Sequence, residues 1–172
     1  MAKSLDLRKY QEDILARLKQ AKQSEQSASH SRLGVKAGGD LLLVNLEDIS
    51  EVAPIPEIQP VPLTRPWFVG VANVRGNLYG VSDLGQFAGH VATVFGVGGR
   101  MLLTHQKYKA NAALLVSSLL GLRNLEEMQE QTATNTSRWG GRLFQDAAGE
   151  SWYELNVSEL ISNPDFIRVG IG

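Results

Sequence analysis

The sequence has no cysteine, few aromatic residues and almost no net charge. The lack of cysteine excludes disulfides, thiolate metal sites and a cysteine nucleophile. The 17 Lys+Arg residues face 18 Asp+Glu residues, a net charge of −1, which disfavours binding to a nucleic-acid backbone because that requires clustered positive charge. No apolar run approaches the roughly 18 residues of a membrane helix, and charged residues follow Lys3 where a signal peptide would have its apolar segment. We therefore expect a cytoplasmic protein with no direct membrane insertion.

What is present suits a folded chain. The 172 residues suffice for one compact domain or two very small ones. With 43% hydrophobic and 20% charged residues, the sequence is too apolar to be disordered. We expect residues 1–30 to form an N-terminal helix and linker, and residues 31–168 to form the main domain.

The N-terminal segment has a helical pattern. Leu7, Tyr10, Ile14 and Leu18 recur at steps of three and four, which gives one apolar stripe with charged residues around it. The segment Gln23–Ser31 has no such periodicity and reads as a linker. Two hypotheses remain for the helix: it packs on its own domain, or it docks on a partner.

From Arg32 onward the pattern changes to short β-strands separated by turn residues, which favours barrels or sandwiches over a βαβ fold. Four prolines lie within residues 54–62, and because proline lacks a backbone donor we expect an extended edge or loop there. We expect short helices at Leu84–Ala88 and Val157–Ile161. Strands are expected at Leu33–Val35, Leu41–Leu46, Phe68–Arg75, Leu78–Ser82, Val91–Val97, Arg100–Thr104, Asn111–Val116, Leu143–Gln145 and Trp152–Leu155.

Catalytic signals are few. The sequence has no Gly-Lys-Ser/Thr phosphate loop and no Gly-x-Ser-x-Gly nucleophile elbow. His30, His90 and His105 are far apart and lack the spacing of metal ligands, so we expect surface or hydrogen-bonded histidines and no metal or cofactor. A pair of catalytic carboxylates stays possible, although nothing singles one out.

The most informative feature is a predicted hairpin around residue 76. If Ala72 faces the core, strand alternation turns Asn73 and Arg75 to the opposite face. An exposed arginine beside the flexible Gly76 is a good recognition group, because its planar fork binds carboxylates or carbonyls directionally. The alternative is structural: Arg75 pairs with a local acid such as Asp83 and only fixes the hairpin.

The hairpin and its flanks resemble the CheW family of chemotaxis coupling proteins. The family has a Gly-Val-x-Asn-Leu-Arg-Gly hairpin followed by an apolar strand and Asp-Leu, with a Val-x-Glu-Ile/Val element upstream. The matching residues are Ile49-Ser50-Glu51-Val52, Gly70-Val71-Ala72-Asn73-Val74-Arg75-Gly76 and Asp83-Leu84. Pro66-Trp67 ahead of the hairpin is most similar to the PilI branch, the coupling proteins of type IV pilus (twitching) systems. Gly80, where the family usually has proline, and Ser117, where it often has aspartate, depart from the pattern.

The resemblance implies a mainly β fold of two five-stranded barrels side by side, with the change between them near residue 90. It implies a scaffold without enzymatic activity or cofactor. Its expected partners are the cytoplasmic tip of a methyl-accepting chemoreceptor and the regulatory domain of a CheA-like histidine kinase, so that the protein is recruited to membrane-bound receptor arrays. By position, the resemblance assigns partner contacts to Ile49, Glu51, Asn73 and Arg75.

Two other functions remain as alternatives. A small barrel can bind nucleic acid when a basic face carries aromatic residues, and Arg138-Trp139 and Arg142-Leu143-Phe144 hint at such a face. The overall charge opposes this reading. The second alternative is a hydrolase, which would need a deep pocket with two carboxylates of perturbed pKa.

Overall fold

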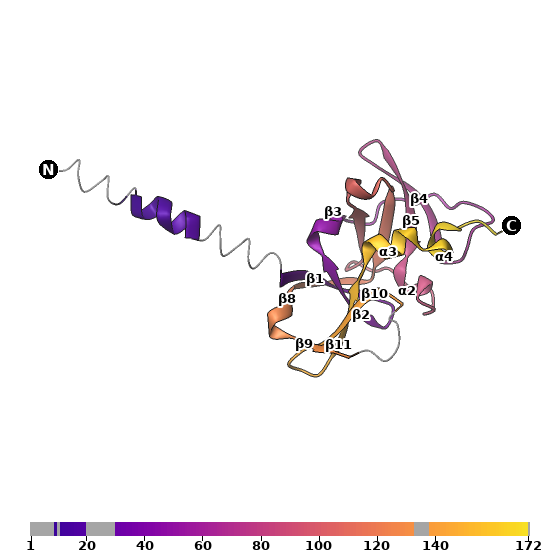
Figure 1. Cartoon of the computed structure of the whole chain (residues 1–172). Helices are drawn as coiled ribbons and strands as arrows, with labels where there is room; N and C mark the ends of the chain where they lie inside the picture. Colours follow the sequence, from indigo (N-terminus) through magenta and orange to yellow (C-terminus); the bar gives the residue numbers. More distant parts are fainter. Residues whose placement is uncertain (1–8, 10, 20–29, 133–137, 172) are drawn as a thin grey trace.

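The computed structural model describes residues 9, 11–19, 30–132 and 138–171. Its strands form two sheets (Figure 1), in agreement with the expected mainly β fold. The six-stranded sheet has the order β8 (Ser118–Asn124), β1 (Ser31–Ala37), β2 (Asp40–Asn45), β11 (Ser151–Leu155), β10 (Gly140–Gln145), β9 (Gln129–Gln131). The five-stranded sheet has the order β3 (Ile49–Ala53), β6 (Arg100–Thr104), β7 (Ala112–Val116), β5 (Asn77–Asp83), β4 (Phe68–Val74). Both orders are open, so the sheets are not closed five-stranded barrels.

The chain is interleaved between the two sheets. It begins in the six-stranded sheet, crosses through the 3₁₀ turn η1 (Leu46–Asp48), builds the whole five-stranded sheet, and returns at Ser117. The change of sheet that we expected near residue 90 falls instead at these two places, because strands β1 and β2 pair with strands formed more than 70 residues later. β2 and β11 pair in parallel, as do β5 and β7.

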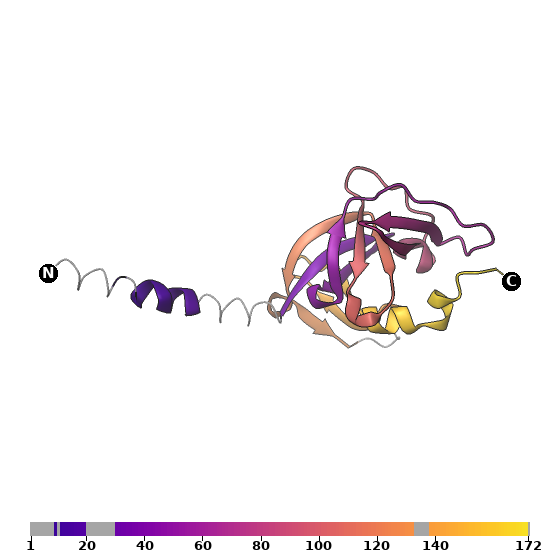
Figure 2. The same cartoon turned by 90° about the horizontal axis from the view of Figure 1, so that it is seen from above.

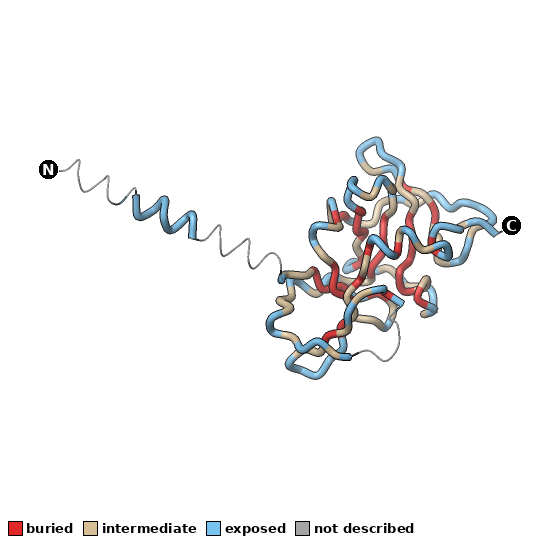
Figure 3. The backbone as a smooth tube through the Cα atoms, in the orientation of Figure 1, coloured by how far each residue is buried: buried red, intermediate tan, exposed pale blue. Residues whose placement is uncertain are grey.

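The central strands are buried on both faces. In β7, Leu114 packs between the two sheets, whereas its neighbour Leu115 packs inside the curve of the five-stranded sheet. In β2, Leu42 and Val44 face the space between the sheets and Leu43 faces the other side of the six-stranded sheet. This explains why these strands are continuous apolar runs rather than alternating ones. Buried residues accordingly concentrate in the middle of both sheets (Figure 3).

The proline-rich segment lies along the outer edge of β4, as an extended edge. Gln59 and Val71 exchange two backbone hydrogen bonds, of 2.8 and 2.9 Å. The approach is close enough that a Cβ on Gly70, whose φ is +149°, would come within 2.2 Å of the Gln59 carbonyl oxygen. The prolines therefore cover a sheet edge that would otherwise offer unpaired backbone groups to other chains.

Short helices fill the ends of the sheets. They are α2 (Leu84–Phe87), α3 (Val157–Ser162) and α4 (Pro164–Ile167), with further 3₁₀ turns η2 (Gln106–Tyr108) and η3 (Leu125–Glu127). Asp83, Asn156 and Asn163 cap the α-helices by accepting from backbone N–H groups, as expected for residues with short polar side chains. Both predicted helices are thus confirmed. Figure 2 shows α3 and α4 along one side of the sheets.

One expected strand is absent. Residues 91–96 form no strand, and Val91, Val94 and Val97 are 89, 93 and 98% exposed. Valine favours a strand only when neighbouring strands accept its side chain and backbone, and no strand of the described chain pairs with this segment. The apolar composition here therefore marks an exposed loop.

The N-terminal segment is helical over residues 11–19. Ile14, Leu15 and Leu18 are 41, 58 and 57% exposed, so the apolar stripe of these residues is not buried against the sheets. Leu7 and Tyr10 lie outside the described residues. Among the helices that the structure describes, none has the length and apolar character needed to cross a membrane.

Candidate functional site

The β4–β5 hairpin ends in the two-residue turn Arg75-Gly76. Both residues have positive φ, +52° and +84°, which is the geometry of the tight turn that matches strand twist. The Asn73 side chain supports this turn, because its Oδ1 accepts a hydrogen bond of 2.9 Å from the Gly76 backbone N–H. Asn73, one of the predicted recognition residues, therefore also stabilises the turn.

Arg75 pairs with Glu51 across the opening of the five-stranded sheet. Its Nη2 contacts Oε1 of Glu51, which lies on the edge strand β3, whereas Arg75 follows the opposite edge strand β4. The Arg75 side chain is 75% exposed and that of Glu51 29%. The carboxylate thus orients the guanidinium without covering it, and the other N–H donors of the guanidinium remain directed at solvent.

Asp83, the acid that the structural alternative named for Arg75, is not its partner; the ion pair is with Glu51. Asp83 is 2% exposed, caps α2 by accepting from the Gln86 N–H at 3.3 Å, and accepts from both the backbone N–H and the hydroxyl of Thr93 at 2.9 Å. This carboxylate fixes the start of α2 and the loop that follows, so it does not pair with the hairpin tip.

The sequence-based site residues do not all reach the surface. The structure brings Glu51, Asn73 and Arg75 together, but Ile49 is only 9% exposed and packs in the core between the sheets. Sequence reasoning missed Leu78, which pairs across the hairpin with Asn73 and is 58% exposed. Cross-strand neighbours share a face, so Leu78 adds an apolar contact beside the charged groups.

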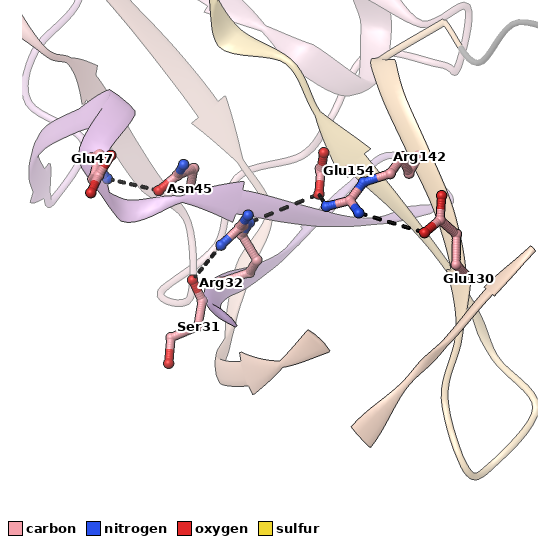
Figure 4. A network of polar contacts seen from close by, with 7 residues as sticks. All are labelled: Ser31, Arg32, Asn45, Glu47, Glu130, Arg142 and Glu154. Atoms are coloured by element: carbon pink, nitrogen blue, oxygen red, sulfur yellow. Dashed lines mark hydrogen bonds and ion pairs between the residues drawn. The ribbon is translucent and has the colours of Figure 1, made fainter. Parts of the chain in front are cut away.

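A second charged cluster, drawn in Figure 4, is internally neutralised. Arg142 contacts Glu154 at 3.0 Å and Glu130 at 3.5 Å, and Arg32 reaches Glu154 at 3.9 Å. The hydrogen bond to Glu154 is the main reason that the pKa of Arg142 is raised. Arg142 also lies 5.0 Å from the centre of the Phe144 ring. Of the residues that hinted at nucleic-acid binding, Arg142 is therefore engaged with carboxylates and Trp139 donates a hydrogen bond to Asp40, whereas no ion pair joins Arg138 to another described residue.

The histidines have separate local contacts. His30 lies 3.6 Å from Glu126 and His90 3.3 Å from Asp40, while Nδ1 of His105 accepts a hydrogen bond from the backbone of η2. Across the described ranges, no three histidine or acidic side chains converge as a metal site would require.

Comparison with solved structures first identifies the fold. The crystal structure of scaffolding protein TtCheW from Thermoanaerobacter tengcongensis has the same fold, with a TM-score of 0.66 at 15% identity over 79% of this chain and 94% of that one.

The sequence then places the chain in a family: residues 32–165 match the CheW-like domain, and the protein belongs to the CheW-like family. Proteins of this family are scaffolds, not enzymes. Protein PilI of Pseudomonas aeruginosa is 29% identical over 102 residues, which are 59% of this chain and 57% of that protein. The alignment thus spans less than two thirds of that relative.

Proposed function

We propose that this chain is a non-enzymatic adaptor that couples methyl-accepting chemoreceptors to a CheA-like histidine kinase, in a chemosensory pathway controlling type IV pilus twitching motility. The observation that carries the proposal is the exposed Arg75 at a rigid turn, oriented by Glu51. Family membership and the similarity to PilI support the class of pathway.

The receptor site that we propose consists of Glu51, Asn73, Arg75 and Leu78. A receptor tip is a helical hairpin, which presents carboxylates and carbonyl oxygens beside apolar side chains. The free N–H donors of Arg75 suit the oxygens, and the exposed Leu78 suits the apolar stripe. The pair with Glu51 reduces the number of orientations open to the guanidinium, which lowers the entropy lost on binding.

The kinase would bind elsewhere on the domain through its own CheW-like regulatory domain. An adaptor that holds both partners raises the effective concentration of each near the other, so no chemistry by the adaptor is needed. The protein would then work in the cytoplasm and be recruited to receptor arrays by its partners.

The test is co-elution of the purified chain with a receptor cytoplasmic-tip fragment and with the kinase regulatory domain. We expect Arg75→Ala to weaken receptor binding by at least about tenfold, as for a charge-assisted contact at an interface centre, while kinase binding is retained. Lys36→Ala is the matched control, because Lys36 is an exposed cation on β1 of the other sheet.

Two results would contradict the proposal in different ways. Equal receptor binding by the parent chain and Arg75→Ala would show that the receptor site lies elsewhere. Failure of the parent chain to bind either fragment would show that the chain is not a receptor–kinase coupler.

A further inference from the structure

A cleft of about 460 Å³ lies at the other end of β4 from Arg75. At roughly 3.3 Å per strand residue, the eight residues from Trp67 to Arg75 put the two places about 26 Å apart along β4. The cleft lies between the segment before β4, the end of α2, the segment before β10, and α4. Its lining residues are Arg65, Trp67, Phe87, Ala88, Arg138, Trp139, Asn163, Asp165 and Arg168.

Three arginines of this cleft have no partner within the described part of the chain. No ion pair or side-chain hydrogen bond joins Arg65, Arg138 or Arg168 to another described residue. The arginines elsewhere in residues 30–171 are all engaged: Arg32 and Arg142 with Glu154, Arg75 with Glu51, Arg100 with backbone carbonyls, and Arg123 over the Trp152 ring. With Asp165 as the acidic residue of the lining, the cleft carries a net charge of about +2.

The base of the cleft is aromatic and fixed in place. Trp67 stacks on Phe166 with ring centres 5.4 Å apart and meets Phe87 edge-on at 5.1 Å. Trp139 is 3% exposed, and its Nε1 donates a 3.1 Å hydrogen bond to Asp40. A rigid apolar base beneath unpaired guanidinium groups binds an anion with an apolar neighbour at little entropic cost.

The backbone holds two of the arginines near each other. The Arg65 N–H donates a 2.7 Å hydrogen bond to the carbonyl of Val169, the residue after Arg168. An isolated bridge between Thr64 and Gly170 continues this pairing. Neighbouring like charges repel each other, and two carboxylates bound between them would remove that repulsion.

We propose that this cleft binds an acidic peptide segment of a protein partner, with its carboxylates on the three arginines and an apolar side chain against Trp67. The site is separate from the receptor site and goes beyond the proposed coupling function. All three arginines are exposed at the rim, which suits a peptide lying across the surface better than a metabolite that must be mostly enclosed.

A neighbouring hollow extends the site and sets a preference. It has a volume of about 520 Å³ and shares Arg138, Trp139 and Asn163 with the first cleft, and Glu159 lines it. The two hollows are therefore adjacent. Glu159 would repel a carboxylate, so the peptide is expected to be acidic over the first cleft and neutral or basic over the second.

The experiment is a titration of the ¹⁵N-labelled full chain with a synthetic peptide of repeated Glu-Glu-Leu, followed by NMR. The indole N–H signals of Trp67 and Trp139 should shift, while that of Trp152, which packs with Leu43 on the other side of the six-stranded sheet and donates to Asp146, should not. A Gln-Gln-Leu peptide is the uncharged control. Added salt should weaken binding, because the contacts are between exposed charges.

Variants identify the residues responsible. Single Arg65→Gln, Arg138→Gln and Arg168→Gln changes should each weaken binding of the acidic peptide by about tenfold, as for a lost charge-assisted contact, and Lys36→Gln should leave it unchanged. Each of these variants should still bind the receptor fragment, which separates this site from the one at Arg75.

Three results would overturn the proposal. They are an equal response to both peptides, retention of full peptide binding in all three single variants, and saturation of the two indole signals by inorganic phosphate without any response to the peptide. The last would assign the cleft to a small anion instead.

Discussion

Replacing Arg75 by asparagine should change receptor affinity while leaving the free energy of unfolding nearly the same. Arg75 has φ +52°, a left-handed conformation that asparagine adopts more readily than a long side chain, and Asn-Gly is the preferred pair for this type of turn. Arg75→Asn therefore relieves backbone strain at the hairpin tip while it removes the guanidinium.

The expected change in the free energy of unfolding is small. The turn should gain up to about 1 kcal/mol from the better left-handed residue. The lost pair with Glu51 offsets this by about 0.2–1 kcal/mol, the usual contribution of an exposed ion pair, since the Arg75 side chain is 75% exposed. The two effects nearly cancel, so we expect the stability to stay within about 1 kcal/mol of the parent chain.

Receptor binding should change far more than stability. Loss of an oriented guanidinium at an interface costs about 2 kcal/mol or more, which is roughly a 30-fold weaker affinity. Urea denaturation measures the first quantity and titration of a receptor-tip fragment the second. Glu51→Gln is the companion variant, because it removes the ion pair but keeps the guanidinium, and it should weaken binding less than Arg75→Asn does.

The reasoning would be refuted by the opposite pattern. If Arg75→Asn lowers the free energy of unfolding by more than about 2 kcal/mol and leaves receptor affinity unchanged, then the pair with Glu51 serves the fold and not recognition.

Three further predictions concern the fold. Gly70→Ala should destabilise the protein by about 2–4 kcal/mol in urea denaturation, because its Cβ would meet the Gln59 carbonyl at 2.2 Å. Leu114→Ala should lose about 2–5 kcal/mol in the same assay, because Leu114 is fully buried between the sheets. Burial, and then the hydrogen bond to Asp48, raise the pKa of Tyr108 from 10.0 to about 12. The neutral phenol therefore contributes to the free energy of unfolding below pH 10, and this contribution should be lost as the pH rises from 10 towards 12. Tyr108→Phe should not show that loss.

Each of these has a matched comparison. Gly76→Ala also alters a glycine with positive φ, but nothing lies within 4 Å of its added Cβ, so a loss as large as that of Gly70→Ala would contradict the steric explanation. Leu78→Ala should have little effect on stability, since Leu78 is 58% exposed. For Tyr108, absorbance should show one of the four tyrosines ionising later than the others, and titration of all four together would contradict the raised pKa.

Local patterns predicted the strands and the hairpin well. The apolar run Ala112–Val116 is a strand buried on both faces, and the prolines after residue 53 mark an extended edge. Val91–Val97 has a similar composition but is an exposed loop. The prediction failed there because a strand requires a neighbouring strand to pair with, and local composition does not indicate whether one is present. β8 (Ser118–Asn124) was not predicted as an element, since Gly121 and the register shift opposite β1 interrupt its pattern.

Sequence reasoning named Glu51, Asn73 and Arg75 as site residues, but it did not predict that Arg75 and Glu51 form an ion pair. The Glu51 carboxylate that pairs with Arg75 lies 24 residues earlier in the sequence, on the opposite edge of the sheet. Only the folded sheet brings these residues together. The same holds for Arg65, Arg138 and Arg168, which are isolated in the sequence and converge only when the segment before β4, the segment before β10 and α4 meet.

The threading of the chain through both sheets has a consequence for how the molecule can be divided. Strands β1 and β2 need β8 and β11 as neighbours, and the complete five-stranded sheet lies between them in the chain. No single cut yields two self-sufficient fragments, because any cut between residues 46 and 117 separates the halves of the six-stranded sheet and any later cut removes its final strands. The protein should therefore gain or lose its structure as one cooperative unit, and evolution could have lengthened its loops far more easily than it could have exchanged one of its sheets.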